Sequence, residues 1–324
     1  MATGDSMTAT GGCPVCDRSL TRLAQGRDRY SFYLCEGCGL VTSLPIPTAE
    51  ELAAYYDGFL FGVPRDEDAA ASERELLDDT HRIAADIKQI AGLEPPAKVL
   101  DWGGGTGFYA NAFAELGFAT TMIDIDRPAC DYAASRFAGK FQTVNADPVA
   151  HAFSEPYDII FSNNVIEHCP DVRATMATIR RVLAPGGILV LTTPNRASWE
   201  WYARPFWGLS YVRKAAAGRL AALWKFWRTP WLCCDPPRHI HAFESRSLRQ
   251  LLDHAGLDVI ACFSEYSPTQ YYCHRVRPDL QYRRPLSVFR IGLELWTFGV
   301  LWLLQRLDRR RLRGHNLIVF ARPR

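Results

Sequence analysis

From residue 98 onward, the spacing of apolar and polar positions alternates between two patterns along the chain. Short aliphatic runs predict strands over residues 98–102, 119–125, 140–146, 157–163, 188–193, 257–265 and 316–322. Stretches with helical spacing predict helices near residues 108–116, 127–137, 171–183 and 245–255. Strands that alternate with helices predict an α/β fold with a doubly wound, seven-stranded parallel sheet. A long excursion precedes the last strand, which lets that strand return antiparallel between its neighbours.

The N-terminal part of the chain carries a different pattern, two Cys-x-x-Cys pairs separated by 18 residues. The four cysteines are Cys13, Cys16, Cys35 and Cys38. This spacing is typical of a zinc ribbon, in which four protein thiolates close a tetrahedral, structural metal site. We therefore predict a zinc ribbon over residues 1–47, a helical linker or cap over 48–97, and the main domain over 98–324.

Composition and cysteine usage favour a folded protein of the cytoplasm. The chain has 324 residues, of which 48% are apolar, and its first residues contain no apolar run of the kind found in export signals. Ten cysteines without such a signal favour reduced thiols or metal ligands over disulfides.

A glycine-rich turn, VLDWGGGTG over residues 99–107, follows the first strand of the main domain. No lysine follows Gly107, which excludes a P-loop for triphosphates. The turn also satisfies a loose dinucleotide fingerprint, but Asp101 lies two positions before Gly103, where a carboxylate would repel a pyrophosphate. The same carboxylate would attract the ammonium group of a methionine moiety. The turn therefore predicts S-adenosylmethionine as the cofactor, and Asp124, at the end of the second strand, fits its ribose.

Residues 98–195 resemble class I S-adenosylmethionine-dependent methyltransferases, above all in NNVIEHCPDVRATMATIRRVLAPGGILVLTTPN. The zinc ribbon and the segment PPRHIHAFESRSLRQLLDHAGLDV (residues 236–259) are similar to a bacterial branch near ubiquinone-type O-methyltransferases and zinc-containing sugar C-methyltransferases. The resemblance implies a Rossmann-like methyltransferase sheet. It also implies in-line methyl transfer to a small-molecule, glycan or lipid-linked acceptor, with transfer to oxygen favoured slightly over transfer to carbon.

The resemblance also implies which residues bind the cofactor. Asp124 would accept hydrogen bonds from both ribose hydroxyls, and Asp147 would meet the adenine amino group, although its register is one residue away from the family's pattern. Asn163 and Asn164 would line the turn beneath the sulfonium. The full predicted set is Asp101, Gly103, Gly105, Gly107, Asp124, Asp147, Asn163 and Asn164.

Three histidines are candidates for the general base, because imidazole suits proton transfer near neutral pH. His239 and His241 lie in PRHIHAF, where the sugar C-methyltransferases carry a His-Glu-His element, and His168 follows the fourth strand. Of the two histidines in this segment, we expect His241 to be the base. Ubiquinone-type relatives bind magnesium through Glu-x-x-Glu-His. Asn164 stands at the first position here, so we do not expect a catalytic metal.

The second half of the chain predicts a surface for an amphipathic acceptor. Residues 196–324 carry a net charge of +13, against −11 for residues 1–195, and hold eight of the nine tryptophans. The insertion 196–235 is predicted to form a lid over the site. The insertion 266–313 contains an apolar helix with a basic end, too short to span a bilayer and typical of a helix at an anionic membrane surface. An ordinary helical cap is the alternative, and we expect a peripheral position on the inner face of the membrane.

Two other functions are compatible with the sequence. An RNA methyltransferase would use the zinc ribbon and the basic half, and a catalytically silent protein of this fold would only bind the cofactor. Arginine clustered with tryptophan and leucine favours lipid over nucleic acid, which calls for basic residues spread along a groove. The intact Asp101 and Asp124 argue against a silent protein.

Overall fold

The computed structural model describes residues 11–25, 29–57, 66–198, 234, 236–265 and 312–324, with single positions at 296, 299 and 303. The chain forms two compact units. The first comprises Met1–Thr193, Cys234–Cys262 and Ile318–Arg324, and the second comprises Pro194–Cys233 and Phe263–Leu317. The predicted lid and the predicted interfacial helix lie almost entirely outside the described residues. Among the residues that are described, no helix is long and apolar enough to span a membrane.

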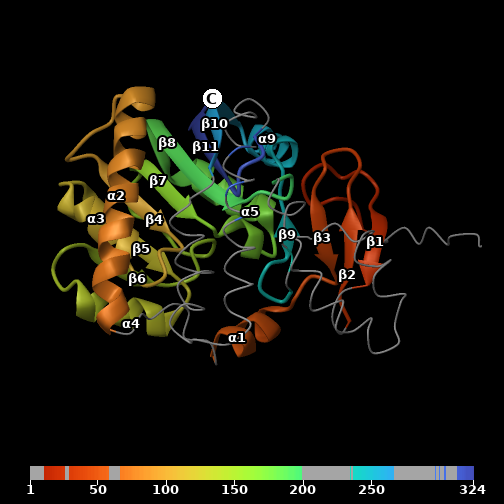
Figure 1. Cartoon of the computed structure of the whole chain (residues 1–324), viewed down its shortest axis with the longest axis horizontal. Helices are drawn as coiled ribbons and strands as arrows, with labels where there is room; N and C mark the ends of the chain where they lie inside the picture. Colours follow the sequence, from red (N-terminus) through yellow and green to blue (C-terminus); the bar gives the residue numbers. More distant parts are fainter. Residues whose placement is uncertain are drawn as a thin grey trace, which may run out of the picture. The chain divides into compact units, whose positions relative to one another are not determined.

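A seven-stranded sheet with the strand order β10-β11-β8-β7-β4-β5-β6 forms the centre of the first unit, with its last strand antiparallel (Figure 1). The strands are β4 (Lys98–Trp102), β5 (Ala119–Asp124), β6 (Gln142–Asn145), β7 (Tyr157–Asn163), β8 (Leu183–Pro194), β10 (Leu257–Glu265) and β11 (Asn316–Pro323). This order confirms the predicted doubly wound sheet, including the return of the last strand between its neighbours. β8 begins five residues before its predicted start at residue 188.

Helices connect these strands, and short polar side chains fix where two of them begin. They are α1 (Ala49–Asp57), α2 (Asp66–Ala91), α3 (Phe108–Glu115), α4 (Arg127–Arg136), α5 (Val172–Val182) and α9 (Ser245–His254), with a 3₁₀ turn η1 (Ile166–His168). Asp126 caps α4 by accepting a hydrogen bond from the backbone N–H of Ala129. Asp171 caps α5 in the same way through the N–H groups of Arg173 and Ala174.

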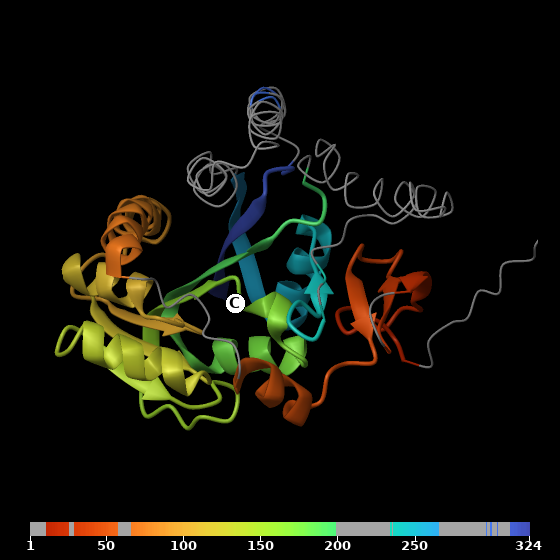
Figure 2. The ribbon, with the colours of Figure 1, turned by 60° about the horizontal axis from the view of Figure 1, so that its bottom comes forward.

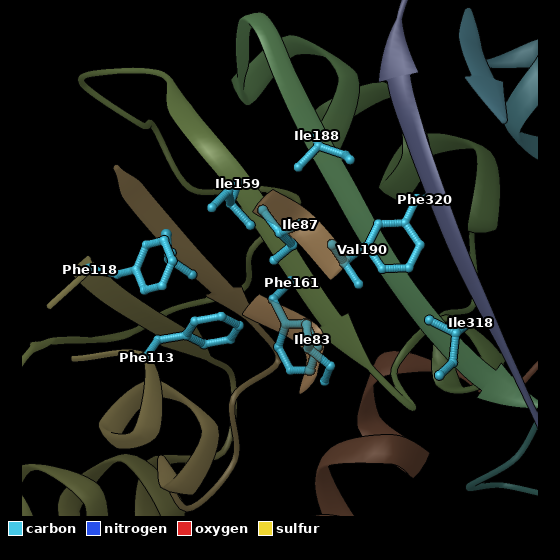
Figure 3. Close-up of a cluster of buried hydrophobic side chains, with 11 residues drawn as sticks. Ile83, Ile87, Phe113, Phe118, Ile159, Phe161, Ile188, Val190, Ile318 and Phe320 are labelled. Atoms are coloured by element: carbon cyan, nitrogen blue, oxygen red, sulfur yellow. The ribbon is translucent and has the colours of Figure 1, made fainter. Parts of the chain in front are cut away.

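One face of the sheet carries a core of large side chains beneath α2 and α3 (Figure 3). Phe113 from α3 packs edge-on against Phe161 of β7, with ring centroids 5.3 Å apart. Ile159 and Phe161 face this core, and the intervening Ile160 is also fully buried. Both faces of the strand are therefore covered, as expected for the inner strands of a parallel sheet.

The zinc-ribbon region forms a separate four-stranded sheet with the order β1-β2-β3-β9. Its first three strands, β1 (Thr21–Gln25), β2 (Ser31–Leu34) and β3 (Val41–Leu44), come from the N-terminal segment. The fourth, β9 (His241–Ala242), comes from PRHIHAF and pairs antiparallel with β3 (Figure 1 and Figure 2). The sequence did not predict this pairing, which joins the ribbon to a segment with candidate catalytic residues.

Candidate active site

The glycine-rich turn follows β4 and has a left-handed backbone at three of its glycines. The φ angles of Gly103, Gly105 and Gly107 are 74°, 54° and 78°, a region that side chains with a Cβ atom rarely adopt. A Cβ atom on Gly103 would lie only 2.6 Å from Cγ2 of Val165, in the turn after β7. Glycine at this position therefore lets the turn after β4 pack directly on the turn after β7.

Asp101 lies under this turn with an unsatisfied carboxylate oxygen. Its side chain is 2% exposed, and its Oδ2 has no hydrogen-bond partner among the described residues. Burial raises the pKa of Asp101 to about 7, and the nearby charge of Asp124 adds to the shift. A Cβ atom on Gly104 would lie 2.6 Å from the same Oδ2. A buried acceptor directly beneath a backbone turn suits a cationic ligand group.

Asp124 joins the turn to the end of β5. Its Oδ2 accepts a hydrogen bond from the N–H of Gly105, and its Oδ1 accepts one from the N–H of Asp126, both at 2.8 Å. Burial raises the pKa of Asp124, although both hydrogen bonds lower it. Asp147 follows the neighbouring strand β6 and is exposed, with its Oδ1 accepting from the N–H of Val149 at 2.9 Å. Both carboxylates lie at the carboxyl ends of adjacent parallel strands, where open α/β sheets bind ligands.

The turn after β7 begins at the two predicted asparagines. Asn163 accepts a hydrogen bond from the hydroxyl of Thr192 in β8. Asn164 has a φ of 54°, and its N–H donates to the carbonyl of Thr192 at 3.1 Å. Its Oδ1 is buried without a partner in the described part of the chain. These contacts fix the start of the turn that carries Glu167 and His168.

Glu167, His168 and His239 form a cluster that sequence reasoning did not assemble. Their metal-ligating or proton-accepting atoms all lie within 4.8 Å of one another. The rings of His168 and His239 meet edge-on with centroids 4.6 Å apart, and Nε2 of His168 lies 3.9 Å from Oε1 of Glu167. In the sequence, Glu167 is the second acid of the Glu-x-x-Glu-His pattern, in which Asn164 replaces the first. Its position directly before His168 was the available signal.

Glu167 is the buried acid of this cluster. Its side chain is 1% exposed, and its Oε2 accepts a hydrogen bond from the hydroxyl of Thr193 at 2.9 Å. Its Oε1 is buried and makes no hydrogen bond to any described residue. Burial raises the pKa of Glu167 to about 7. Burial also lowers the pKa of His168 to about 3, with a further contribution from His239, so the ring of His168 is neutral at physiological pH.

The surroundings of His241 argue against its predicted role as the base. The side chain is fully buried, with Nδ1 lying 3.0 Å from Oγ1 of Thr42 and Nε2 lying 3.1 Å from the carbonyl oxygen of Cys169. Burial lowers the pKa of His241 to about 4. Since both nitrogens are already hydrogen-bonded within the protein, the ring has none to offer an acceptor. His239, two residues earlier, contacts the ring of His168 instead.

Glu167, His168 and His239 could ligate a cation, but their donor atoms do not suit magnesium. Magnesium prefers oxygen ligands, and this set contains one carboxylate and two imidazoles. The positive charge of Arg238 also acts on both Glu167 and His168, after the larger effect of burial. Both features argue against magnesium at this cluster.

The four predicted zinc ligands do converge. The Sγ atoms of Cys13 and Cys38 are 3.5 Å apart, those of Cys16 and Cys35 are 3.4 Å apart, and all four lie within 4.8 Å of one another. Four thiols at these separations fit the tetrahedral Cys₄ geometry of structural zinc.

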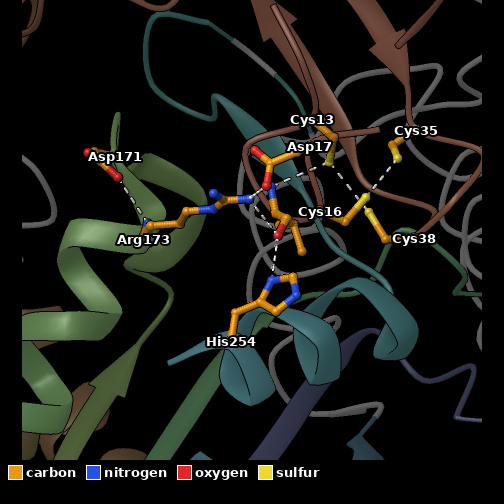
Figure 4. Close-up of polar contacts among 9 residues, drawn as sticks. Cys13, Cys16, Asp17, Cys35, Cys38, Asp171, Arg173 and His254 are labelled. Atoms are coloured by element: carbon orange, nitrogen blue, oxygen red, sulfur yellow. Dashed lines mark hydrogen bonds and ion pairs between the residues drawn. The ribbon is translucent and has the colours of Figure 1, made fainter. Parts of the chain in front are cut away.

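The first Cys-x-x-Cys loop is held by two helices of the main domain (Figure 4). The carbonyl oxygen of Val15 lies 3.0 Å from the guanidinium of Arg173 in α5 and 2.8 Å from Nδ1 of His254 in α9. Arg173 also donates to the carboxylate of Asp17 at 2.7 Å. The metal-binding loop and the main domain are thus in direct contact.

Comparison with known proteins places this site in a family. A family model for the methyltransferase domain matches residues 70–261, more than half of the chain. The chain belongs to this methyltransferase family. The match covers the glycine-rich turn, the cluster and PRHIHAF, and it confirms the family resemblance seen in the sequence.

Individual relatives match the methyltransferase over part of their length. An uncharacterized methyltransferase of Mycobacterium tuberculosis (strain H37Ra) is 33% identical over 129 residues, which are 39% of this chain and 51% of the relative. A ubiquinone biosynthesis O-methyltransferase of Bradyrhizobium sp. (strain ORS 278) is 29% identical over 136 residues, 40% of this chain and 51% of the relative. The chain therefore spans about half the length of the curated relatives that it matches.

A solved structure shows the same fold at low sequence identity. The [4+2]-cyclase SpnF superposes with a TM-score of 0.50 and 17% identity, covering 86% of this chain and 98% of that one. This similarity supports the fold alone. The name of that protein shows that the fold does not fix the reaction, which has to be argued from the site.

The buried Asp101 should make the stability of the apo protein depend on pH. Its folded-state pKa of about 7 lies above its ordinary value of 3.8, so stability is lost as pH rises toward 7. Asp101→Asn removes this loss. Between pH 5.5 and 8 the free energy of unfolding of the wild type should fall by about 2 kcal/mol more than that of the variant. Urea unfolding at both pH values measures this, with Asp126→Asn as the control. Equal pH dependence in wild type and Asp101→Asn would contradict the prediction.

Proposed function

We propose that the protein transfers a methyl group from S-adenosylmethionine to a hydroxyl of a small, amphipathic acceptor. The observation that carries this proposal is the contact between the glycine-rich turn and the turn after β7, through Gly103 and Val165. Asp101, a buried carboxylate with an unsatisfied oxygen, lies near the end of β4 just before the first of these turns, and Glu167 of the cluster lies in η1 just after Val165. Asp101 suits the cationic end of the cofactor, and the cluster with Glu167 suits a proton released by the acceptor.

The residues around the turn fit S-adenosylmethionine better than a nicotinamide dinucleotide. Oδ2 of Asp101 would accept from the methionine ammonium, and the glycines would let the backbone approach the same end. Asp124 would hold the ribose, Asp147 the adenine amino group, and the 163–164 turn would lie beneath the sulfonium. The bound cofactor supplies a methyl group already activated for in-line displacement, so the protein has to position the acceptor and take up one proton.

We assign the uptake of that proton to His239, supported by His168 and Glu167. His239 is partly exposed, whereas His241 is fully buried and hydrogen-bonded on both nitrogens. A proton gained by His239 would lie close to the carboxylate of Glu167, and opposite charges at such a distance stabilise each other. Because the pKa of Glu167 is about 7, this stabilisation becomes available as pH rises through 7.

The acceptor class rests on the sequence and on one relative. The Bradyrhizobium relative is named an O-methyltransferase of ubiquinone biosynthesis, which supports transfer to oxygen. The tryptophans and the net charge of +13 after residue 195 support an amphipathic acceptor presented at an anionic membrane surface. Nucleic acid is less well supported, because the arginines after residue 195 are clustered with tryptophan and leucine and are not spread along a groove.

Methyl transfer should depend on Glu167 and should rise with pH through 7. The assay follows S-adenosylhomocysteine by mass spectrometry, with hydroxylated aromatic acceptors with and without an apolar tail, and with free sugars. Glu167→Gln should lower kcat by about 10²-fold or more and remove the rise with pH. Glu155→Gln, the same change at an exposed carboxylate, should leave both unchanged. Cofactor binding without transfer to any acceptor would instead favour a silent binding protein.

The purified protein should contain one zinc ion per chain, held by the four cysteines of the ribbon. Metal analysis of protein prepared without chelator measures this content. Cys16→Ser removes one of the four ligands, so it should lower zinc content and the melting temperature, since binding energy at a structural site is folding energy. Cys130→Ser, at a buried cysteine outside the ribbon, should leave zinc content unchanged. Wild-type protein without zinc would contradict this assignment.

A further inference from the structure

We propose that strand β3 of the zinc ribbon is a positioning element for the active site, with Thr42 and His241 fixing the register that places His239 against His168. The inference rests on the proposed function for the role of His239. It extends that function by giving the ribbon a part in catalysis through residues that touch neither cofactor nor acceptor.

The ribbon holds residues 240–242 from one side. β9 pairs with β3 so that Thr42 lies opposite His241 and Val41 lies opposite Ala242. The carbonyl oxygen of Ile240 accepts from the N–H of Ser43 at 2.9 Å and from the hydroxyl of Ser43 at 3.1 Å. Thr42, Ser43, Ile240 and His241 are all fully buried. Water therefore cannot replace these bonds when one of them is lost.

The turn after β7 holds the same segment from the other side. The N–H of Ile240 donates to the carbonyl oxygen of Glu167 at 2.8 Å. Nε2 of His241 lies 3.1 Å from the carbonyl oxygen of Cys169, and Nδ1 of His168 lies 3.0 Å from the carbonyl oxygen of Arg238. The segment thus bridges the ribbon and the turn that carries the proposed proton acceptors.

The bond between Thr42 and His241 has one consistent arrangement of protons. The carbonyl oxygen of Cys169 can only accept, so Nε2 of His241 carries the hydrogen. A neutral imidazole then has its lone pair on Nδ1, and the hydroxyl of Thr42 must donate to it. Valine has the shape of threonine without this donor, so Thr42→Val would leave a buried nitrogen without a partner.

A side-chain bond matters here because β9 has only two residues. Side chains alternate along a strand, so a slip of one residue would turn both His239 and His241 to the opposite face. The backbone bonds of so short a strand specify the register weakly. The buried hydrogen bond from Thr42 to His241 distinguishes the observed register from the slipped one, in which His239 would leave His168.

Histidine ring NMR tests this coupling without a known acceptor. The full-length, zinc-loaded protein is labelled with ¹⁵N-histidine, and the His168, His239 and His241 signals are assigned with His→Gln variants. Thr42→Val should change the tautomer signals of His241 and should shift the ring ¹⁵N signals of His239 and His168 as the contact between these two rings loosens. Thr42→Ser keeps the hydroxyl and should restore the wild-type spectra. Thr21→Val, the same change at an exposed position of β1, should have no effect.

The outcomes separate this inference from the proposed function. Unchanged His168 and His239 signals in a folded, zinc-containing Thr42→Val variant would overturn it. If that variant fails to fold, Ser43→Ala decides, because it removes the side-chain bond to Ile240 and keeps the backbone bond. A shift of the His239 signal then supports the inference, and unchanged spectra overturn it. Absence of methyl transfer by the wild type would count against the proposed function, whereas the spectra would still decide whether the ribbon positions His239.

Discussion

The direct contact of two turns, at the carboxyl ends of β4 and β7, is the constraint on which the site depends. Gly103 adopts a φ of 74°, and Val165 occupies the space that its side chain would need. Any larger residue at position 103 would push the turns apart, and with them Asp101 and the segment that carries Glu167 and His168. The proposed cofactor site and the proposed proton acceptors are neighbours because β4 pairs with β7 and because no side chain at position 103 separates the turns that follow these strands.

Burial gives two carboxyl groups near these turns the same unusual property. Asp101 and Glu167 are each almost inaccessible, each has an oxygen without a hydrogen bond among the described residues, and the pKa of each is raised to about 7. Ionisation of such a group costs free energy when the group is isolated, and it becomes favourable beside a positive charge. In our account the charge beside Asp101 is the ammonium of the cofactor, and the charge beside Glu167 is an imidazolium formed during transfer.

The sequence predicted the parts of the structure that depend on local patterns. Strand positions followed from apolar runs, helix α4 followed from the helical spacing near residues 127–137, and the converging cysteines followed from their spacing. The role of His241 could not be predicted, because its partner Thr42 lies 199 residues away in the chain. Without the β3–β9 pairing, the sequence favoured His241 over His239 as the base. The cluster around Glu167 was missed for the same reason, since His239 reaches it only through the fold.

A crystal structure of the protein with bound S-adenosylhomocysteine would test the central claim most directly. The account predicts that the amino group of the ligand lies within hydrogen-bond distance of Oδ2 of Asp101. It also predicts that the ribose hydroxyls meet Asp124 and that the sulfur faces the side of the turn where His239 and Glu167 lie. A ligand whose amino group avoids Asp101, or whose sulfur points away from the Glu167–His168–His239 cluster, would contradict it.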